Sequence, residues 1–199
     1  AGWTICKKIP TTTCQAGNSK QEKIMIKPFT DSLTEYIKGI RTKTLIIACN
    51  DWKAESYLRS NANLTLLSVF GLNLESAGEY TMQEIATAIK TFQYKQIILL
   101  ADHPCQIQEQ VIKDFVENKE TYGFAKVLAQ TKIVLENDRL KYSDSLFTAM
   151  VYLRYQFNYL ENYLYDYFFQ EERAIPPING IVFKNNYKVY ELERFELNN

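Results

Sequence analysis

Short apolar runs alternate along this chain with segments of helical spacing. Two runs, Thr44 to Ala48 and Gln96 to Leu100, are continuous enough for strands covered on both faces. Leu64 to Phe70, closed by Gly71, predicts a further strand, and Lys132 to Glu136 is a fourth candidate. Strands that alternate with helices predict a parallel sheet joined by right-handed crossovers.

Four longer segments carry helical periodicity between these runs. They are Phe29 to Ile40, Thr81 to Phe92, Gln106 to Asn118 and Ser145 to Gln170. Thr30 or Asp31 is the expected N-cap of the first helix, and Thr81 with Glu84 predicts a capping box for the second. Glu55 to Arg59 predicts a further helical turn.

The two ends of the chain differ from its middle. Residues 1–27 lack periodicity and predict an N-terminal arm, which leaves 28–199 as a single domain. Gly180 to Phe183 and Lys188 to Leu192 predict a hairpin across Asn185-Asn186. The expected fold class is therefore α/β, with a central, mainly parallel sheet flanked by helices, an N-terminal arm and a C-terminal β-hairpin.

The composition of the chain limits the kinds of partner that we expect it to bind. The chain has 199 residues, 46% of them hydrophobic and 23% charged, which is typical of a soluble globular protein. Lysine plus arginine equals aspartate plus glutamate, so no net charge draws the protein to nucleic acid or to a membrane. The chain begins without Met and without a signal-like segment, which fits a trimmed form. We expect a cytoplasmic protein.

The four cysteines fall into two groups. Cys6 and Cys14 lie in a threonine-rich leader, where a small disulfide loop, idle thiols or metal binding all remain open. Cys49 and Cys105 instead follow the two clearest strand runs. Four cysteines are too few for a disulfide scaffold at this length.

Ligands of an open α/β sheet bind outside the carboxyl ends of its strands. Two strand ends here carry side chains with metal or acid–base chemistry, and we expect Cys49 and Cys105 to lie within a few ångströms of each other. These side chains are Cys49, Asp51, Lys53, Asp102, His103 and Cys105. Thiolate with imidazole or carboxylate is a set of ligands typical of zinc. His103 is the single histidine of the chain, so its place in this set carries weight.

The order of these elements resembles that of the β-class carbonic anhydrases. The family reads Cys-x-Asp-Ser-Arg after its first sheet strand, and this chain reads Cys49-Asn50-Asp51-Trp52-Lys53. The family's Gly-His-x-x-Cys corresponds to Ala101-Asp102-His103-Pro104-Cys105. Its Val-x-x-Gln-Val-x-Asn-Leu helix is similar to Leu153 to Leu160, and its closing hairpin resembles residues 179–189. The resemblance runs from Phe29 to Leu192 and implies a zinc enzyme for the reversible hydration of CO2 to bicarbonate.

The departures from the family are concentrated at its polar positions. An alignment without a gap puts Cys105 on the second zinc cysteine and Asp102 on the zinc histidine, and His103 then comes one residue late. Lys53 stands where the family has an arginine that grips the aspartate equivalent to Asp51. An ammonium group cannot form the two parallel hydrogen bonds of a guanidinium. The resemblance therefore implies a weakened catalytic pair, Asp51 and Lys53.

The implied metal site has open alternatives. Zinc would take Cys49, Cys105 and either Asp102 or His103, because adjacent side chains of an extended segment point to opposite sides. Asp51 is a candidate fourth ligand. The alternative is a pair of reduced, buried cysteines without metal.

The helix from Ser145 to Gln170 is crowded with tyrosine and phenylalanine on more than one face. Such a helix predicts burial or an interface with a wet rim. Because the family forms intimate dimers, we expect a homodimer or higher assembly with this helix or the N-terminal arm in the interface.

Two functions follow. The first is a β-carbonic-anhydrase-like zinc lyase with weakened hydration of CO2. The second is a catalytically inactive homologue with a structural, metal-binding or regulatory role. The missing arginine and the displaced histidine favour low or absent activity.

Overall fold

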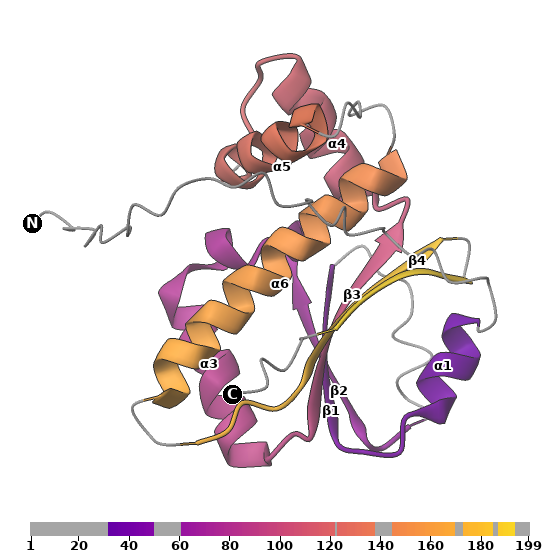
Figure 1. The fold of residues 1–199 in the computed structure, drawn as a ribbon, viewed down its shortest axis with the longest axis vertical. Helices are drawn as coiled ribbons and strands as arrows, with labels where there is room; N and C mark the ends of the chain where they lie inside the picture. The colour runs from indigo at the N-terminus through magenta and orange to yellow at the C-terminus, as the bar shows by residue number, and fades with distance from the viewer. Residues whose placement is uncertain are drawn as a thin grey trace, which may run out of the picture.

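The computed structural model describes residues 32–49, 61–121, 123–137, 145–169, 173–184 and 187–193. Within them a five-stranded sheet has the order β2-β1-β3-β4-β5 (Figure 1). Its strands are β1 (Thr44–Cys49), β2 (Leu64–Val69), β3 (Gln96–His103), β4 (Ile178–Lys184) and β5 (Tyr187–Glu193). The pairs β1–β2, β1–β3 and β3–β4 are parallel, and β4–β5 is antiparallel. This confirms the predicted fold class.

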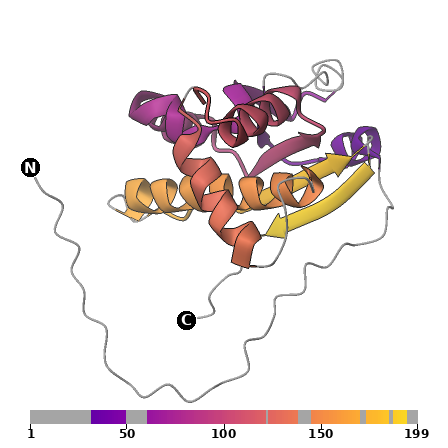
Figure 2. The ribbon, with the colours of Figure 1, turned by 90° about the horizontal axis from the view of Figure 1, so that it is seen from above.

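The sheet separates two apolar cores of unequal size. Odd-numbered residues of β1 and β3, such as Ile47 and Leu99, pack into a large core with α3 (Leu74–Phe92), α4 (Gln106–Val116), α5 (Ala125–Asn137) and α6 (Ser145–Phe169). Even-numbered residues, such as Ile98, pack into a small core under α1 (Leu33–Gly39). Figure 2 shows α5 crossing α6 on the helix-rich side. Every residue of β1 is buried, as a strand covered on both faces requires.

The N-cap of helix α1 lies one or two residues after the predicted positions. Ser32 is the N-cap, and its hydroxyl accepts a hydrogen bond from the Glu35 backbone N–H. The Glu35 carboxylate in turn accepts from the Ser32 backbone N–H, which completes a capping box. The expectation of Thr30 or Asp31 was wrong because only Ser32 has a glutamate three residues later.

Helix α3 begins seven residues before its predicted start. Asn73 caps it by accepting a hydrogen bond from the Ser76 backbone N–H. The backbone of Gly78 then leaves helical geometry at φ 83°, so the helix is kinked there. Thr81 donates its hydroxyl proton to the Ala77 carbonyl inside the helix, so the predicted Thr81–Glu84 capping box was wrong. Because the helix is kinked at Gly78, its periodicity located the part after the kink and missed the part before it.

The predicted fourth strand, Lys132 to Glu136, lies within helix α5. Val127, Leu128 and Thr131 are buried on one side of that helix, a spacing of one and four residues that belongs to a helix. Ile133 is half exposed, whereas a strand inside the sheet would bury it. The short apolar run was therefore part of a longer amphipathic pattern.

Several predictions fall outside the described residues. They concern the arm of residues 1–27, Cys6 and Cys14, the helical turn from Glu55 to Arg59, and the turn at Asn185-Asn186. In the part of the chain that the structure describes, no helix is both long and apolar enough to span a membrane.

Candidate functional site

Cys49 and Cys105 lie side by side at the carboxyl ends of neighbouring strands. Cys49 is the last residue of β1, and Cys105 is the N-cap of α4, two residues after β3 ends. Their Sγ atoms are 3.3 Å apart, and 4% and 5% of the two residues' surfaces are exposed. The prediction that these two thiols meet is confirmed. Because β1 and β3 are adjacent and parallel, the topology itself brings the two ends together.

The strand register puts Asp102 and His103 on opposite faces of the sheet. Asp102 pairs with Phe183, which belongs to the small core under α1. Ala101 pairs with Val182 and lies in the large core, as both cysteines do. Since side chains alternate along a strand, His103 continues the row of Ala101 on the cysteine face. His103 is buried, whereas Asp102 is partly exposed.

The two thiols suit zinc in type and in spacing. Two thiolates on one tetrahedral zinc lie about 3.8 Å apart, given Zn–S bonds of about 2.3 Å. The pair would therefore need to open by only about half an ångström from the observed 3.3 Å. Within the described ranges, however, no three His, Cys, Asp or Glu side chains are grouped closely enough to hold one metal ion. The described residues thus supply ligands for two coordination positions of zinc. Asp51 and Lys53 lie outside the described residues.

A turn with a left-handed glycine lies beside the thiols. Phe70–Leu72 forms a short 3-10 turn (η1) directly after β2, and Gly71 has φ 59°. A Cβ on Gly71 would come within 2.4 Å of the Phe124 ring, so a larger residue would meet both backbone strain and a clash. The turn therefore approaches Phe124 as closely as a glycine permits.

Two buried side chains hold this turn by its carbonyl. The Tyr152 hydroxyl donates to the Gly71 oxygen at 3.0 Å, and Gln108 Nε2 donates to the same oxygen at 3.3 Å. Tyr152 also stacks on Phe124 with a centroid separation of 6.4 Å. The turn, α4 and α6 are thereby joined at one atom next to the cysteine pair.

Tyr152 stays protonated in this environment. Its pKa is raised well above its ordinary value, first by burial and then by negative charge on Cys105 and Cys49. The phenol therefore remains a hydrogen-bond donor to Gly71 at any physiological pH. Tyr152 lies on the helix for which the sequence predicts burial or an interface, and it is buried in the large core near the cysteines. The sequence feature that could have indicated this place is the position of Tyr152 four residues before Gln156, the glutamine of the family-like helix motif.

Gln156 extends the same support one turn along α6. It is fully buried, and its Oε1 accepts a hydrogen bond from the Leu74 backbone N–H at 2.9 Å. This N–H is one of the donors that the first turn of α3 leaves without a helical partner. Residues 152 and 156 of α6 therefore fix both η1 and the start of α3.

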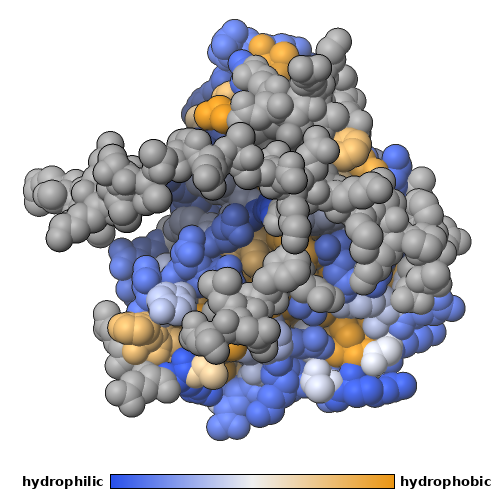
Figure 3. Space-filling model, viewed as in Figure 1, coloured by the Kyte–Doolittle hydropathy of each residue, from blue (hydrophilic) through white to orange (hydrophobic). Residues whose placement is uncertain are grey.

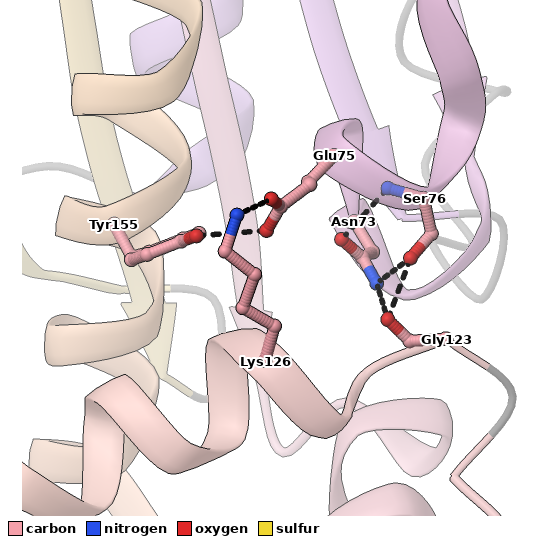
Figure 4. Close-up of polar contacts among 6 residues, drawn as sticks. All are labelled: Asn73, Glu75, Ser76, Gly123, Lys126 and Tyr155. Carbon is pink, nitrogen blue, oxygen red and sulfur yellow. Dashed lines mark hydrogen bonds and ion pairs between the residues drawn. The ribbon is translucent and has the colours of Figure 1, made fainter. Parts of the chain in front are cut away.

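A second polar cluster surrounds the start of α3 on the rim of the large core (Figure 4). Glu75 forms an ion pair with Lys126 and accepts a hydrogen bond from the Tyr155 hydroxyl at 2.7 Å. Ser76 donates to the Gly123 carbonyl at 2.7 Å. These contacts tie the first turn of α3 to α5, to α6 and to the turn before α5.

The protonation of this cluster follows from its contacts. Burial by itself would raise the pKa of Glu75, but the hydrogen bonds from Lys126 and Tyr155 and the lysine charge lower it overall. The same partnership raises the pKa of Lys126. Burial, then the bond to Glu75, raises the pKa of Tyr155. At neutral pH the cluster therefore consists of a carboxylate, an ammonium group and a neutral phenol.

Much of the aromatic helix α6 is buried within the chain itself. Tyr152, Phe157 and Phe168 are buried in the large core, whereas Tyr165 and Phe169 are exposed near the helix's C-terminal end. Figure 3, which shows the face of the molecule seen in Figure 1, shows hydrophobic surface there as separate patches. The predicted use of this helix as an interface therefore concerns its outer side only.

Comparisons with known proteins bear on the fold. No protein-family model and no curated protein sequence matches the chain. Among solved structures, a cysteine-to-alanine variant of the β-carbonic anhydrase CafD of Aspergillus fumigatus is similar, with a TM-score of 0.57 at 16% identity, over 76% of this chain and 89% of that one. Wild-type CafD gives 0.57 at 14% identity, over 78% and 95% of the two chains. CafA of the same fungus gives 0.51 at 12% identity, over 79% and 77%. The chain thus has the fold of the β-carbonic anhydrases in a strongly diverged sequence.

Proposed function

We propose that this protein is a β-carbonic-anhydrase-like zinc protein with weak activity in the reversible hydration of CO2 to bicarbonate. One observation carries the proposal: two buried sulfurs 3.3 Å apart at the carboxyl ends of adjacent parallel strands, in a fold shared with β-carbonic anhydrases. Two thiols with a purely structural role would not need to lie at the carboxyl ends of the strands, which is where ligands of open α/β sheets bind.

The proposed zinc ligands are Cys49 and Cys105, with His103 as the third ligand. His103 is preferred to Asp102 because its row of β3 faces the cysteines, whereas Asp102 faces α1. Asp51 follows Cys49 by two residues and is the candidate for the remaining position. When bound, zinc would supply the Lewis acidity that makes water nucleophilic toward CO2 at neutral pH.

The chain's own residues would hold the surroundings of the two thiols in place and exclude water from the site. Tyr152 and Gln108 hold the Gly71 carbonyl, so the turn beside the thiols keeps one conformation. Both cysteines are buried in the large core near Tyr152, whose ring stacks on Phe124, and this apolar packing would exclude water from the site. An ammonium group at Lys53, in place of the family arginine, would not hold Asp51 with two parallel hydrogen bonds, so the Asp51 carboxylate would be available as a zinc ligand.

A catalytically inactive homologue is the second candidate. Two observations favour it: no third ligand joins the thiol pair among the described residues, and Lys53 replaces the arginine of the family motif. Such a protein would keep the fold for metal binding, assembly or regulation.

Metal analysis of the purified protein tests the zinc part. We expect about one zinc per chain after loading and desalting, and its loss in Cys49→Ser and Cys105→Ser variants. A Cys6→Ser/Cys14→Ser double variant is the matched control, because it also removes two thiols and should keep the zinc. A loaded wild-type protein without zinc would contradict the proposal.

Stopped-flow hydration of CO2 tests the reaction. We expect a rate far below that of an efficient carbonic anhydrase, and little recovery in Lys53→Arg because the displaced His103 remains. A rate typical of an efficient enzyme would show that Lys53 replaces the arginine adequately. No rate above the buffer reaction in a zinc-loaded protein would favour the inactive homologue.

We further propose a homodimer, in which the outer side of α6 lies at the interface. Tyr165 and Phe169 on this side are exposed in the single chain, and Phe169 shows 70% of its surface. Light scattering at micromolar concentration should give twice the chain mass, and a monomer would count against this assembly.

A further inference from the structure

Cys49 and Cys105 also have a chemistry that does not involve a metal. We propose that the pair is a reversible oxidation site, which a hydroperoxide converts to an intramolecular disulfide. This inference goes beyond the proposed function, because it requires neither zinc nor CO2 hydration. It rests on the placement of the two sulfurs and on the side chains around them.

The geometry is close to that of a bond. The sulfurs are 3.3 Å apart, and a disulfide bond is about 2.05 Å long, so the two atoms must approach by little more than one ångström. Cys49 ends β1, and Cys105 lies between β3 and α4, so each side chain comes from the end of an element and not from its middle. Small rotations of the two side chains therefore bring the sulfurs together while the sheet stays in place.

The two cysteines are not equivalent, and Cys105 is the expected nucleophile. It is the N-cap of α4, an 11-residue helix. The partial positive charge at a helix N-terminus stabilises the negative charge on a sulfur that attacks a peroxide. Cys49 ends a buried strand without such a helix, and it is the resolving thiol.

The reaction balances with hydrogen peroxide as the oxidant. The Cys105 thiolate attacks one peroxide oxygen, the O–O bond breaks, and hydroxide leaves with a proton to form water. Cys105 is then a sulfenic acid. The Cys49 sulfur attacks the Cys105 sulfur, the S–O bond breaks, and a second water leaves. Two thiols and one peroxide thus give one disulfide and two waters.

The environment favours the disulfide over further oxidation. Both cysteines belong to the large apolar core, where Tyr152 lies near them. A sulfenic acid formed there is in contact with its resolving thiol from the moment it forms. Capture by Cys49 should therefore precede the attack of a second peroxide. The disulfide removes both thiolates from use as metal ligands, so oxidation would switch off any metal binding by the pair.

The test uses the full chain, metal-free and reduced, in the Cys6→Ser/Cys14→Ser background, so that only the proposed pair can react. After treatment with hydrogen peroxide, the protein is denatured with N-ethylmaleimide and its intact mass is measured. We expect a loss of about 2 Da and no maleimide adducts, against two adducts before oxidation. Tryptic mapping should link the peptide of Cys49 to that of Cys105, and dithiothreitol should restore both adducts.

A Cys49→Ser variant in the same background supplies the contrast. Without the resolving thiol, Cys105 should gain about 32 or 48 Da as sulfinic or sulfonic acid, which dithiothreitol does not reverse. If this variant does not fold, the two-cysteine protein decides by itself. Sulfinic acid on that protein without a linked peptide, or two maleimide adducts after prolonged peroxide treatment, would overturn the inference. Disulfide formation in a protein without CO2 hydration would leave the inference intact, so the two proposals fail separately.

Discussion

The two faces of the sheet show how one strand presents different chemistry to each side. The face under α3 to α6 carries both cysteines and the row of β3 that ends in His103. The face under α1 carries Phe183 and, beside it, Asp102. A shift of one residue along β3 therefore decides whether a side chain meets the thiols or the small core. The motif spacing alone points to Asp102, whereas the pleat of the strand puts His103 on the face of the thiols.

The two faces of the sheet also differ in how much apolar surface they bury. Among the described residues, four helices cover the cysteine face, and one seven-residue helix covers the other. Because the turn η1 and the start of α3 are held by Tyr152, Tyr155 and Gln156 of α6, the surroundings of the thiols depend on packing that starts far away in sequence. The site should therefore be sensitive to changes on the large face and tolerant of changes on the small one.

The largest expected effect is a loss of stability from the large core. Leu160 is fully buried on α6, and Leu160→Ala should cost about 2–5 kcal/mol of unfolding free energy. Leu66 is only partly buried against the small core, and Leu66→Ala should cost below about 2 kcal/mol. Urea denaturation measures both. Equal losses would mean that the two faces contribute alike.

The second prediction separates the two ligand candidates. His103→Ala should lower zinc affinity at least about tenfold, because it removes the donor on the thiol face. Asp102→Asn, its neighbour on the other face, should change the affinity less than about threefold. Competition with a chromophoric chelator measures both variants. The reverse order would show that Asp102 takes the family position despite the register of β3.

The third prediction concerns the turn beside the thiols. Tyr152→Phe keeps the ring stacked on Phe124 and removes the hydroxyl that donates to Gly71, which should cost about 1 kcal/mol. The carbonyl keeps its bond from Gln108, which limits the loss. Tyr165→Phe, an exposed control on the same helix, should stay within about 0.5 kcal/mol of wild type in the same denaturation assay. Indistinguishable variants would show that the Tyr152 hydroxyl does not hold the turn.

The smallest expected effect belongs to the rim. Glu75→Gln should cost less than about 1 kcal/mol at neutral pH, because the pair with Lys126 is partly exposed to water. The pKa of Glu75 is lower in the folded protein than in the unfolded one. Its contribution is therefore complete above the unfolded pKa, near 4.5, and is lost as pH falls through the folded value.

The difference between wild type and Glu75→Gln should accordingly shrink as the pH falls below about 4. Unfolding free energies measured from pH 7 to acid pH check this trend. Glu120→Gln, an exposed charge change after α4, is the control and should stay within about 0.5 kcal/mol of wild type at neutral pH. A Glu75 effect that grows toward acid pH would contradict the sign of its shift.

Local pattern accounts for the strands and for most helices. β1 and β3 could be recognised because strands covered on both faces need continuous apolar residues. The meeting of Cys49 and Cys105 followed from the same runs, since adjacent parallel strands bring their carboxyl ends together. The same approach failed for Lys132 to Glu136, where a short apolar run fits either a strand or one side of a helix. The buried Val127 and Leu128 that decide the matter lie one to two turns earlier.

The sequence by itself determined the fold class, the places of the five sheet strands and the cysteine pair, because each depends on periodicity or on residues next to one strand. Only the tertiary structure decided that His103 and not Asp102 shares the face of the thiols. Register is set by the pairing of β3 with β4, whose residues lie about 80 positions away. Only the tertiary structure, too, brought Tyr152 and Gln108 to one carbonyl of Gly71, since hydrogen bonds across 81 and 37 residues leave no periodic signal in the chain.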